Sequence, residues 1–156
     1  MKGSGQDENK RCAMQWSSDE AADGMCVGPN PSPIEMKYGS LEDQVDDPYS
    51  IYNFTKHTLK LRNQYPVIAR GDTTFEEAYS DDNICVLKKT YEGEEMLIVF
   101  NISSEECTVD LTGLTVNGVD AKEATMAGVL ITQEDTQIEL TEGVANMPIY
   151  SVLLLK

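Results

Sequence analysis

Met96-Leu97-Ile98-Val99-Phe100 is an unbroken run of hydrophobic residues in a chain of 156 residues. In an extended strand, successive side chains point to opposite faces, so Met96, Ile98 and Phe100 share one face while Leu97 and Val99 share the other. Both faces are therefore hydrophobic. This pattern predicts a central strand that is covered on both sides.

Turn signals flank this strand and divide the rest of the chain from Asp72 onward into short strand-like segments. Glu92-Gly93 lies between two such segments and indicates a tight hairpin, and Asn117-Gly118 is a strong signal for a type I′ turn. Repeated short strands at this spacing predict an antiparallel sandwich or barrel with Greek-key connections. We expect strands near 73–79, 84–91, 95–102, 107–111, 114–117, 122–126, 129–132, 136–140 and 148–155.

One long helix is predicted before the strands, over residues 48–65. Asp47 is a good N-cap, Pro48 suits the first helical position, and Pro66 closes the segment. The hydrophobic stripe recurs at helical spacing and contains Ile51, Phe54, Thr55, Thr58, Leu61 and Tyr65. Residues 1–47 are rich in Gly, Ser, Asn, Asp and Pro without a sustained period, and they predict a long irregular loop.

Composition excludes several classes of function. Twelve Lys and Arg against 27 Asp and Glu give a net charge of −15, which repels nucleic acid and anionic membrane surfaces. No hydrophobic run approaches the roughly 20 residues that span a bilayer. We expect no cofactor and no metal site, because the only histidine is His57 and no CxxC pair is present. Without evidence of an oxidising compartment, free thiols are favoured over disulfides at Cys12, Cys26, Cys85 and Cys107.

Several local patterns are interpreted as structural rather than functional. Acidic clusters lack the alternating ligand spacing of a calcium loop and are expected to be solvated surface; they comprise Asp19, Glu20, Asp23, Glu76, Glu77, Asp81 and Asp82. His57 is expected to be an ordinary helix residue. The sequons that begin at Asn53 and Asn101 are expected to be incidental. Arg70-Gly71-Asp72 is explained by a change of direction at Gly71 between helix and strand.

Residues 9–17, Asn-Lys-Arg-Cys-Ala-Met-Gln-Trp-Ser, resemble a motif late in the catalytic barrel of the α-amylase family, glycoside hydrolase family 13, whose usual form is Arg-x-Pro-Met-x-Trp. Arg11, Met14 and Trp16 match, and Ala13 replaces the proline. The resemblance continues in order along the chain. Residues 45–72 resemble the last barrel helix and its exit, and residues 99–103 and 147–151 resemble strands of the C-terminal β domain.

This resemblance implies that the chain consists of two parts and that it lacks the catalytic residues of the family. Residues 1–70 are expected to be a remnant of the catalytic (β/α)8 barrel, and residues 71–156 a C-terminal antiparallel Greek-key β-sandwich. The family's catalytic carboxylates lie upstream of the matched segment, so no catalytic residue is assigned and the chain alone is expected to be inactive. The implied partners are the catalytic barrel and an α-glucan, with Asn9, Lys10, Arg11 and Trp16 shaping an outer sugar subsite in the intact enzyme. Without the barrel, we expect the helix to repack on the β domain or to self-associate.

Two other functions remain open. A free-standing carbohydrate-binding module would present aromatic side chains such as Phe75, Tyr79 and Tyr91 along one sandwich face. An adhesion or structural module would project Arg70, Gly71 and Asp72 from an exposed loop tip. The sequence assigns neither the linkage specificity nor the cellular compartment.

Overall fold

The computed structural model describes residues 14–19 and 38–156. The chain forms two compact units, residues 1–53 and 54–156. None of the described helices is long and hydrophobic enough to cross a membrane.

In the first unit, the expected irregular loop of residues 1–47 is wrong over residues 41–45, which form the short helix α1 (Leu41–Val45). The helix begins there because Ser40 and Asp43 form a capping box. Asp43 N donates to Ser40 Oγ at 3.3 Å, and Ser40 N donates to Asp43 Oδ2 at 2.9 Å. These reciprocal bonds satisfy amide groups that a helix start otherwise leaves unpaired.

The long helix α2 (Ile51–Gln64) begins three residues later than the sequence predicts. Ser50 Oγ accepts a hydrogen bond from Asn53 N at 3.2 Å, which is the contact of an N-cap side chain. Asp47 instead accepts from Tyr49 N at 2.9 Å in a local turn before the helix. Pro66 does end α2, but it also begins a second short helix, α3 (Pro66–Arg70).

The second unit is built on a five-stranded antiparallel sheet in the order β1-β2-β3-β10-β7. Its strands are β1 (Asp72–Phe75), β2 (Ile84–Tyr91), β3 (Glu94–Asn101), β7 (Met126–Leu130) and β10 (Val152–Leu155). The 3₁₀ helix η2 (Glu77–Tyr79) links β1 to β2. The predicted central strand is confirmed, because β3 is the middle strand of this sheet.

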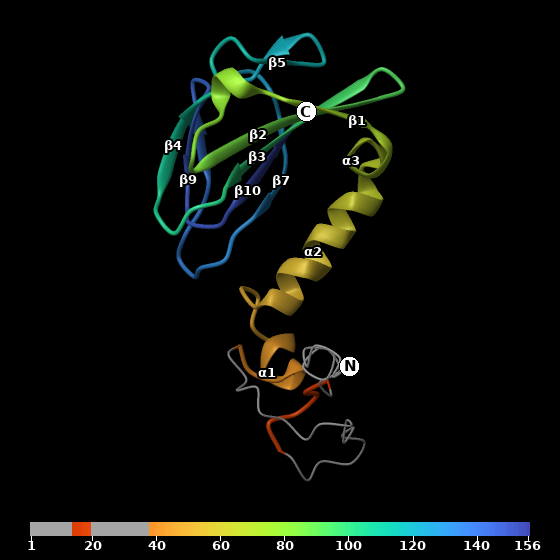
Figure 1. Cartoon of the computed structure of the whole chain (residues 1–156), viewed down its shortest axis with the longest axis vertical. Coiled ribbons are helices and arrows are strands. Elements are labelled where there is room, and N and C mark those ends of the chain that lie inside the picture. The colour runs from red at the N-terminus through yellow and green to blue at the C-terminus, as the bar shows by residue number, and fades with distance from the viewer. Residues whose placement is uncertain (1–13, 20–37) are drawn as a thin grey trace, which may run out of the picture. The chain divides into compact units, whose positions relative to one another are not determined.

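A smaller sheet, β4-β9-β8, forms the second layer, as Figure 1 shows for β4 and β9. Its strands are β4 (Cys107–Asp110), β8 (Glu139–Thr141) and β9 (Val144–Met147). A two-stranded hairpin, β5 (Thr115–Val116) and β6 (Val119–Asp120), turns at Asn117 and Gly118 with φ of 51° and 79°. The same backbone geometry occurs at Glu92 and Gly93, so both predicted hairpins are confirmed.

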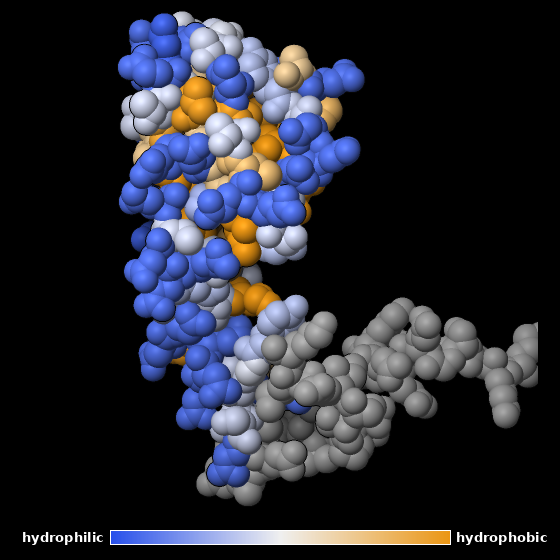
Figure 2. Space-filling view, turned by 90° about the vertical axis from the view of Figure 1, so that its left-hand side faces the viewer, coloured by the Kyte–Doolittle hydropathy of each residue, from blue (hydrophilic) through white to orange (hydrophobic). Residues whose placement is uncertain are grey.

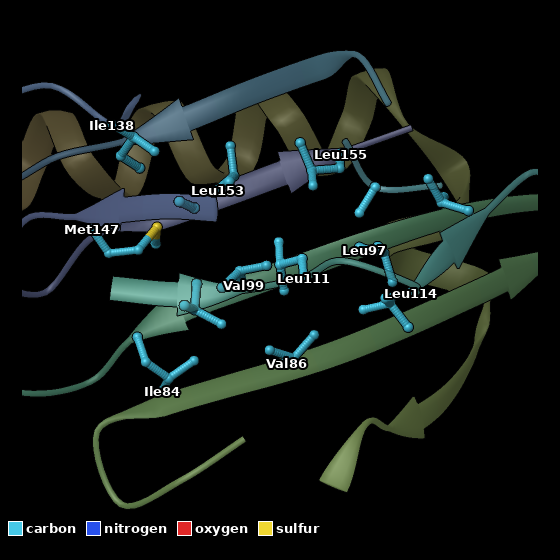
Figure 3. Packing of buried hydrophobic residues seen from close by; sticks show 14 residues of the cluster. Ile84, Val86, Leu97, Val99, Leu111, Leu114, Ile138, Met147, Leu153 and Leu155 are labelled. Carbon is cyan, nitrogen blue, oxygen red and sulfur yellow. The ribbon is translucent and has the colours of Figure 1, made fainter. Parts of the chain in front are cut away.

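Two hydrophobic clusters lie on opposite faces of the five-stranded sheet. Leu97 and Val99 of β3 belong to the sandwich core between the sheets, as Figure 3 shows. Met96 and Ile98 belong to an outer cluster that the helices cover. The alternation predicted for β3 is therefore confirmed, and it explains why this strand is hydrophobic on both faces.

Helix α2 packs on the outer cluster through Phe54, Leu61 and Tyr65. Gly128 of β7 makes room for this contact, since a Cβ there would lie 2.7 Å from Leu61 Cδ2. Tyr65 Oη donates to the carbonyl of Ala127 at 3.2 Å, and Lys156 Nζ lies 5.2 Å from the centre of the Tyr65 ring. Helix α2 therefore contacts the β-sandwich through a specific interface, and the expected repacking or self-association without a barrel stays a prediction.

Several strand predictions differ from the structure for local reasons. Residues 122–125 turn because Asp120 accepts hydrogen bonds from Lys122 N and Glu123 N, and the next strand starts at Met126. Glu142 and Gly143, with φ of 52° and 89°, form a hairpin whose second strand, β9, the sequence analysis did not predict.

The final strand is also shorter than predicted. Pro148 begins a turn in which Tyr150 has a φ of 47° and Ser151 Oγ donates to the Pro148 carbonyl at 2.6 Å. Residues 148–151 therefore stay outside the ladder, and β10 starts at Val152.

Candidate functional site

Trp16 is the one expected subsite residue within the described part of the chain; Asn9, Lys10 and Arg11 lie outside the described residues, as do Cys12 and Cys26. The side chain of Trp16 is 49% exposed. Its carbonyl accepts a hydrogen bond from Glu42 N at 3.0 Å, and the Gln15 carbonyl accepts from Leu41 N at 2.9 Å. The backbone of this segment therefore binds the first amide groups of α1 and leaves the indole ring available for contact.

Side-chain bonds strengthen the same attachment. Ser17 Oγ donates to Glu42 Oε2 at 2.7 Å, and Asp19 N donates to Ser17 Oγ at 3.1 Å. Residues 15–17 are thus fixed to α1 by both backbone and side-chain contacts. This arrangement accounts for a Trp side chain held in place without being buried.

The capping box also shifts the pKa of a carboxylate. The hydrogen bond from Ser40 Oγ to Asp43 Oδ2, at 2.7 Å, lowers the pKa of Asp43, and the bond from Ser40 N lowers it further. Both bonds favour the charged carboxylate. Asp43 is therefore a structural carboxylate that stabilises the helix start.

Asn53 joins α1 to the start of α2. Its side-chain nitrogen donates to the carbonyls of Gln44 (3.0 Å), Val45 (2.9 Å) and Asp47 (2.8 Å), and the residue is 9% exposed. An amide committed to three carbonyls is unavailable for glycosylation. The expectation that this sequon is incidental agrees with the geometry.

Asn101 plays a comparable role in the β-sandwich. It is 2% exposed, and its side-chain nitrogen donates to the carbonyls of Glu105 (2.7 Å), Met147 (3.1 Å) and Pro148 (2.9 Å). Its side-chain oxygen accepts from Ser103 N at 2.9 Å. The sequon pattern by itself does not reveal these structural roles of Asn53 and Asn101.

The aromatic residues of a free-standing binding module do not share a face. Tyr79 packs against the sandwich core and donates to the Thr112 carbonyl at 3.4 Å, whereas Tyr91 packs against the outer cluster. Phe75 is 56% exposed on the edge strand β1. The three rings therefore form no common platform for a sugar.

The acidic clusters within the described residues are built into turns. Asp81 Oδ1 accepts from the backbone nitrogens of Asn83 and Ile84, each at 2.7 Å. Glu76 and Glu77 were predicted to lie in a strand. In the structure, Glu76 is the N-cap of η2 and Glu77 is its first residue. Across residues 14–19 and 38–156, no three His, Cys, Asp or Glu side chains are grouped to hold a metal ion.

Other single residues follow the structural interpretation. His57 is exposed on α2, and Cys85 and Cys107 are free thiols. The reason given for Gly71 is wrong, because its φ is −70°. A glycine is needed there because a Cβ would lie 2.5 Å from the Val67 carbonyl oxygen and 3.0 Å from that of Thr90.

Tyr38, which no sequence pattern singled out, is 66% exposed and lies in the same compact unit as Trp16. A second exposed aromatic ring near the capping residue Ser40 adds to the surface that this unit offers. On the face of the β-sandwich shown in Figure 2, polar side chains predominate and leave only small hydrophobic patches.

The fold defines a class of protein: an antiparallel β-sandwich whose outer sheet face is covered by a preceding helix. Comparison with solved structures identifies this class. Eubacterium rectale Amy13B is 44% identical over all of this chain, with a TM-score of 0.84. The trehalulose synthase MutB from Pseudomonas mesoacidophila MX-45 matches 91% of the chain at 19% identity and a TM-score of 0.66, and therefore supports the fold alone.

Curated relatives agree with the structural match. An oligo-1,6-glucosidase from Parageobacillus thermoglucosidasius is 30% identical over 104 residues, and a trehalose synthase from Thermus thermophilus is 28% identical over 110 residues. No family model matches the chain. Together, these relatives identify the chain as a C-terminal region of the α-amylase family, glycoside hydrolase family 13.

The matches cover only a small part of each relative. The chain spans 18% of the oligo-1,6-glucosidase, 11% of the trehalose synthase and 29% of Amy13B. The similar proteins are therefore several times longer than the segment they share with this chain.

Proposed function

We propose that this chain is the C-terminal portion of an α-amylase family enzyme that acts on α-glucans, and that its β-sandwich stabilises the catalytic barrel. The observation that carries this proposal is the match to Amy13B. The match covers all of this chain and only 29% of Amy13B. In this proposal, residues 1–70 belong to the barrel, residues 71–156 form the C-terminal domain, and the chain by itself performs no hydrolysis.

The two sides of α2 support the proposal that this helix lies between the β-sandwich and the catalytic barrel. Leu61 contributes to the outer cluster of the sandwich, whereas Leu59 is 52% exposed. Contact between this side of α2 and a further protein surface would remove the exposed area of Leu59 from water, which is favourable.

Complementation tests the scaffold role. Amy13B from Eubacterium rectale, truncated by the part that matches this chain, is mixed with the purified chain and analysed by size-exclusion chromatography. We expect the two polypeptides to elute together and the mixture, but not the chain alone, to cleave maltooligosaccharides. Separate elution would contradict the scaffold role, and turnover by the purified chain alone would contradict its predicted inactivity.

A matched pair of variants locates the contact on α2. Leu59→Glu places a charge on the exposed side of the helix and is expected to weaken co-elution. Val119→Glu places the same charge at a 40% exposed position on the β5–β6 hairpin and serves as the control. Equal co-elution of the two variants with truncated Amy13B would argue against a contact through this side of α2.

The sugar subsite is proposed for the complete enzyme alone. Trp16 supplies an aromatic surface for a sugar ring, with Asn9, Lys10 and Arg11 as polar neighbours along the chain. Trp16→Ala in the complemented complex is expected to raise KM for maltooligosaccharides with little loss of complex formation. An unchanged KM would remove Trp16 from the subsite.

NMR titration of the isolated chain with maltooligosaccharides separates this proposal from a free-standing binding module. The scaffold role predicts no localised shifts on the sandwich strands. Shifts confined to strand residues would favour the module.

A further inference from the structure

The turn of the β5–β6 hairpin is hydrogen-bonded to the central strand β3 through Asn117, while Val116 of β5 is buried in the sandwich core with Leu97 and Val99. Asn117 Oδ1 accepts from Glu95 N at 2.7 Å, and Asn117 Nδ2 donates to the Glu95 carbonyl at 3.0 Å. In addition, Asn117 N donates to Glu95 Oε2 at 2.8 Å. The side-chain amide thus pairs with the backbone of Glu95 as a neighbouring strand would.

Asn117 is also followed by Gly118, the sequence context in which asparagine deamidates most readily. Glycine has no side chain that would hinder attack of its own backbone nitrogen on the side-chain Cγ of the preceding asparagine. The space around Gly118 is also open, since a Cβ built there would meet no atom within 4 Å. It is the only Asn-Gly pair among the 156 residues. The residue that bonds the turn to β3 is therefore also a chemically labile one.

We propose that Asn117 is a deamidation site that the fold protects, and that its conversion loosens the turn of the β5–β6 hairpin from β3 while Val116 stays in the core. The nitrogen of Gly118 attacks Cγ of Asn117, a bond forms between them, and the Cγ–Nδ2 bond breaks to release ammonia, which carries away the Gly118 amide proton. Water then opens the cyclic imide to leave aspartate or isoaspartate. Both oxygen and nitrogen of the side chain must leave Glu95 before Cγ can react.

The product cannot restore the contacts of the amide. A carboxylate only accepts hydrogen bonds, so the Glu95 carbonyl loses its donor. The new negative charge also lies beside the Glu95 carboxylate, which accepts from the same turn. In isoaspartate the main chain passes through the former side chain, which lengthens the backbone and disturbs the type I′ geometry.

Protection is measured on the full chain by peptide mass spectrometry during incubation at 37 °C and pH 8. Because the reaction requires local opening, we expect deamidation at Asn117 to be slower by on the order of tenfold or more in the folded chain than in urea. Equal rates in the two states would overturn the protective role.

Two variants test the contact itself. Glu95→Ala removes the acceptor for Asn117 N and is expected to speed deamidation of the folded chain severalfold. Glu94→Ala, at an exposed neighbouring position of β3, is the control and is expected to leave the rate unchanged. A rate in Glu95→Ala no faster than in Glu94→Ala would contradict the proposal.

The structural consequence has a separate readout. Asn117→Asp mimics one product and is expected to increase hydrogen exchange at the amides of residues 115–120, with little change in the five-stranded sheet. Unchanged exchange in the hairpin would show that the turn keeps its place without the amide, and would overturn the loosening step.

Discussion

The side-chain nitrogen of Asn101 lies 3.1 Å from the carbonyl oxygen of Met147, a residue 46 positions further along the chain. Asn101 ends a strand of the five-stranded sheet and Met147 ends a strand of the smaller sheet, so this bond links the two layers of the sandwich. A buried amide therefore adds a polar link between the layers to the hydrophobic core.

Replacing Asn101 is therefore expected to destabilise the chain. Asn101→Ala leaves the carbonyls of Glu105, Met147 and Pro148 without their shared donor, and loss of buried hydrogen bonds predicts a decrease of about 2–4 kcal/mol in the free energy of unfolding. Urea denaturation measures it. Asn146→Ala, at an exposed position, is the control and is expected to change stability by less than about 0.5 kcal/mol.

The two leucines of α2 are expected to differ in their contribution to stability. Leu61→Ala removes side-chain contacts with the outer cluster and is expected to cost about 1–3 kcal/mol. Leu59→Ala, at the exposed position, is expected to change the free energy of unfolding by less than about 0.5 kcal/mol. Thermal unfolding by circular dichroism measures both, and equal losses would contradict the packing of α2 on the sheet.

Gly71 is expected to resist replacement although its backbone angles are ordinary. In Gly71→Ala the added Cβ would lie 2.5 Å from the Val67 carbonyl oxygen, so α3 and β1 must shift apart. Overpacking of this kind costs about 1–3 kcal/mol. The exposed substitution Ala69→Ser provides the comparison in urea denaturation, and equal midpoints for the two variants would rule out the close approach.

Acid is expected to loosen the start of α1 through Asp43. The Ser40 hydrogen bonds lower the pKa of Asp43 in the folded chain, so its contribution to stability is present above the unfolded pKa and disappears as pH falls through the folded pKa. NMR of the amides of residues 41–45 is expected to show fraying in acid. Asp43→Asn is expected to abolish this pH dependence locally, and an unchanged titration of these amides in that variant would exclude Asp43 as its origin.

Sequence alone determined the features that depend on neighbouring residues. The alternation from Met96 to Phe100 predicted a central strand with two hydrophobic faces, and the Glu92-Gly93 and Asn117-Gly118 pairs predicted two hairpins. These predictions succeed because side-chain alternation and positive φ angles are local properties of a strand and a turn. The ordered motifs likewise identified the α-amylase family before any fold was known.

Tertiary structure alone decided which residues hold distant segments together. Asn53 and Asn101 matched a glycosylation pattern in the sequence, yet burial and distant carbonyl groups make them structural links. Helical spacing placed Leu61 in the hydrophobic stripe, but only the fold shows that the surface it packs on includes Gly128 of β7. The physical reason is that hydrogen-bond partners and burial depend on segments far apart in the chain, which local sequence patterns do not specify.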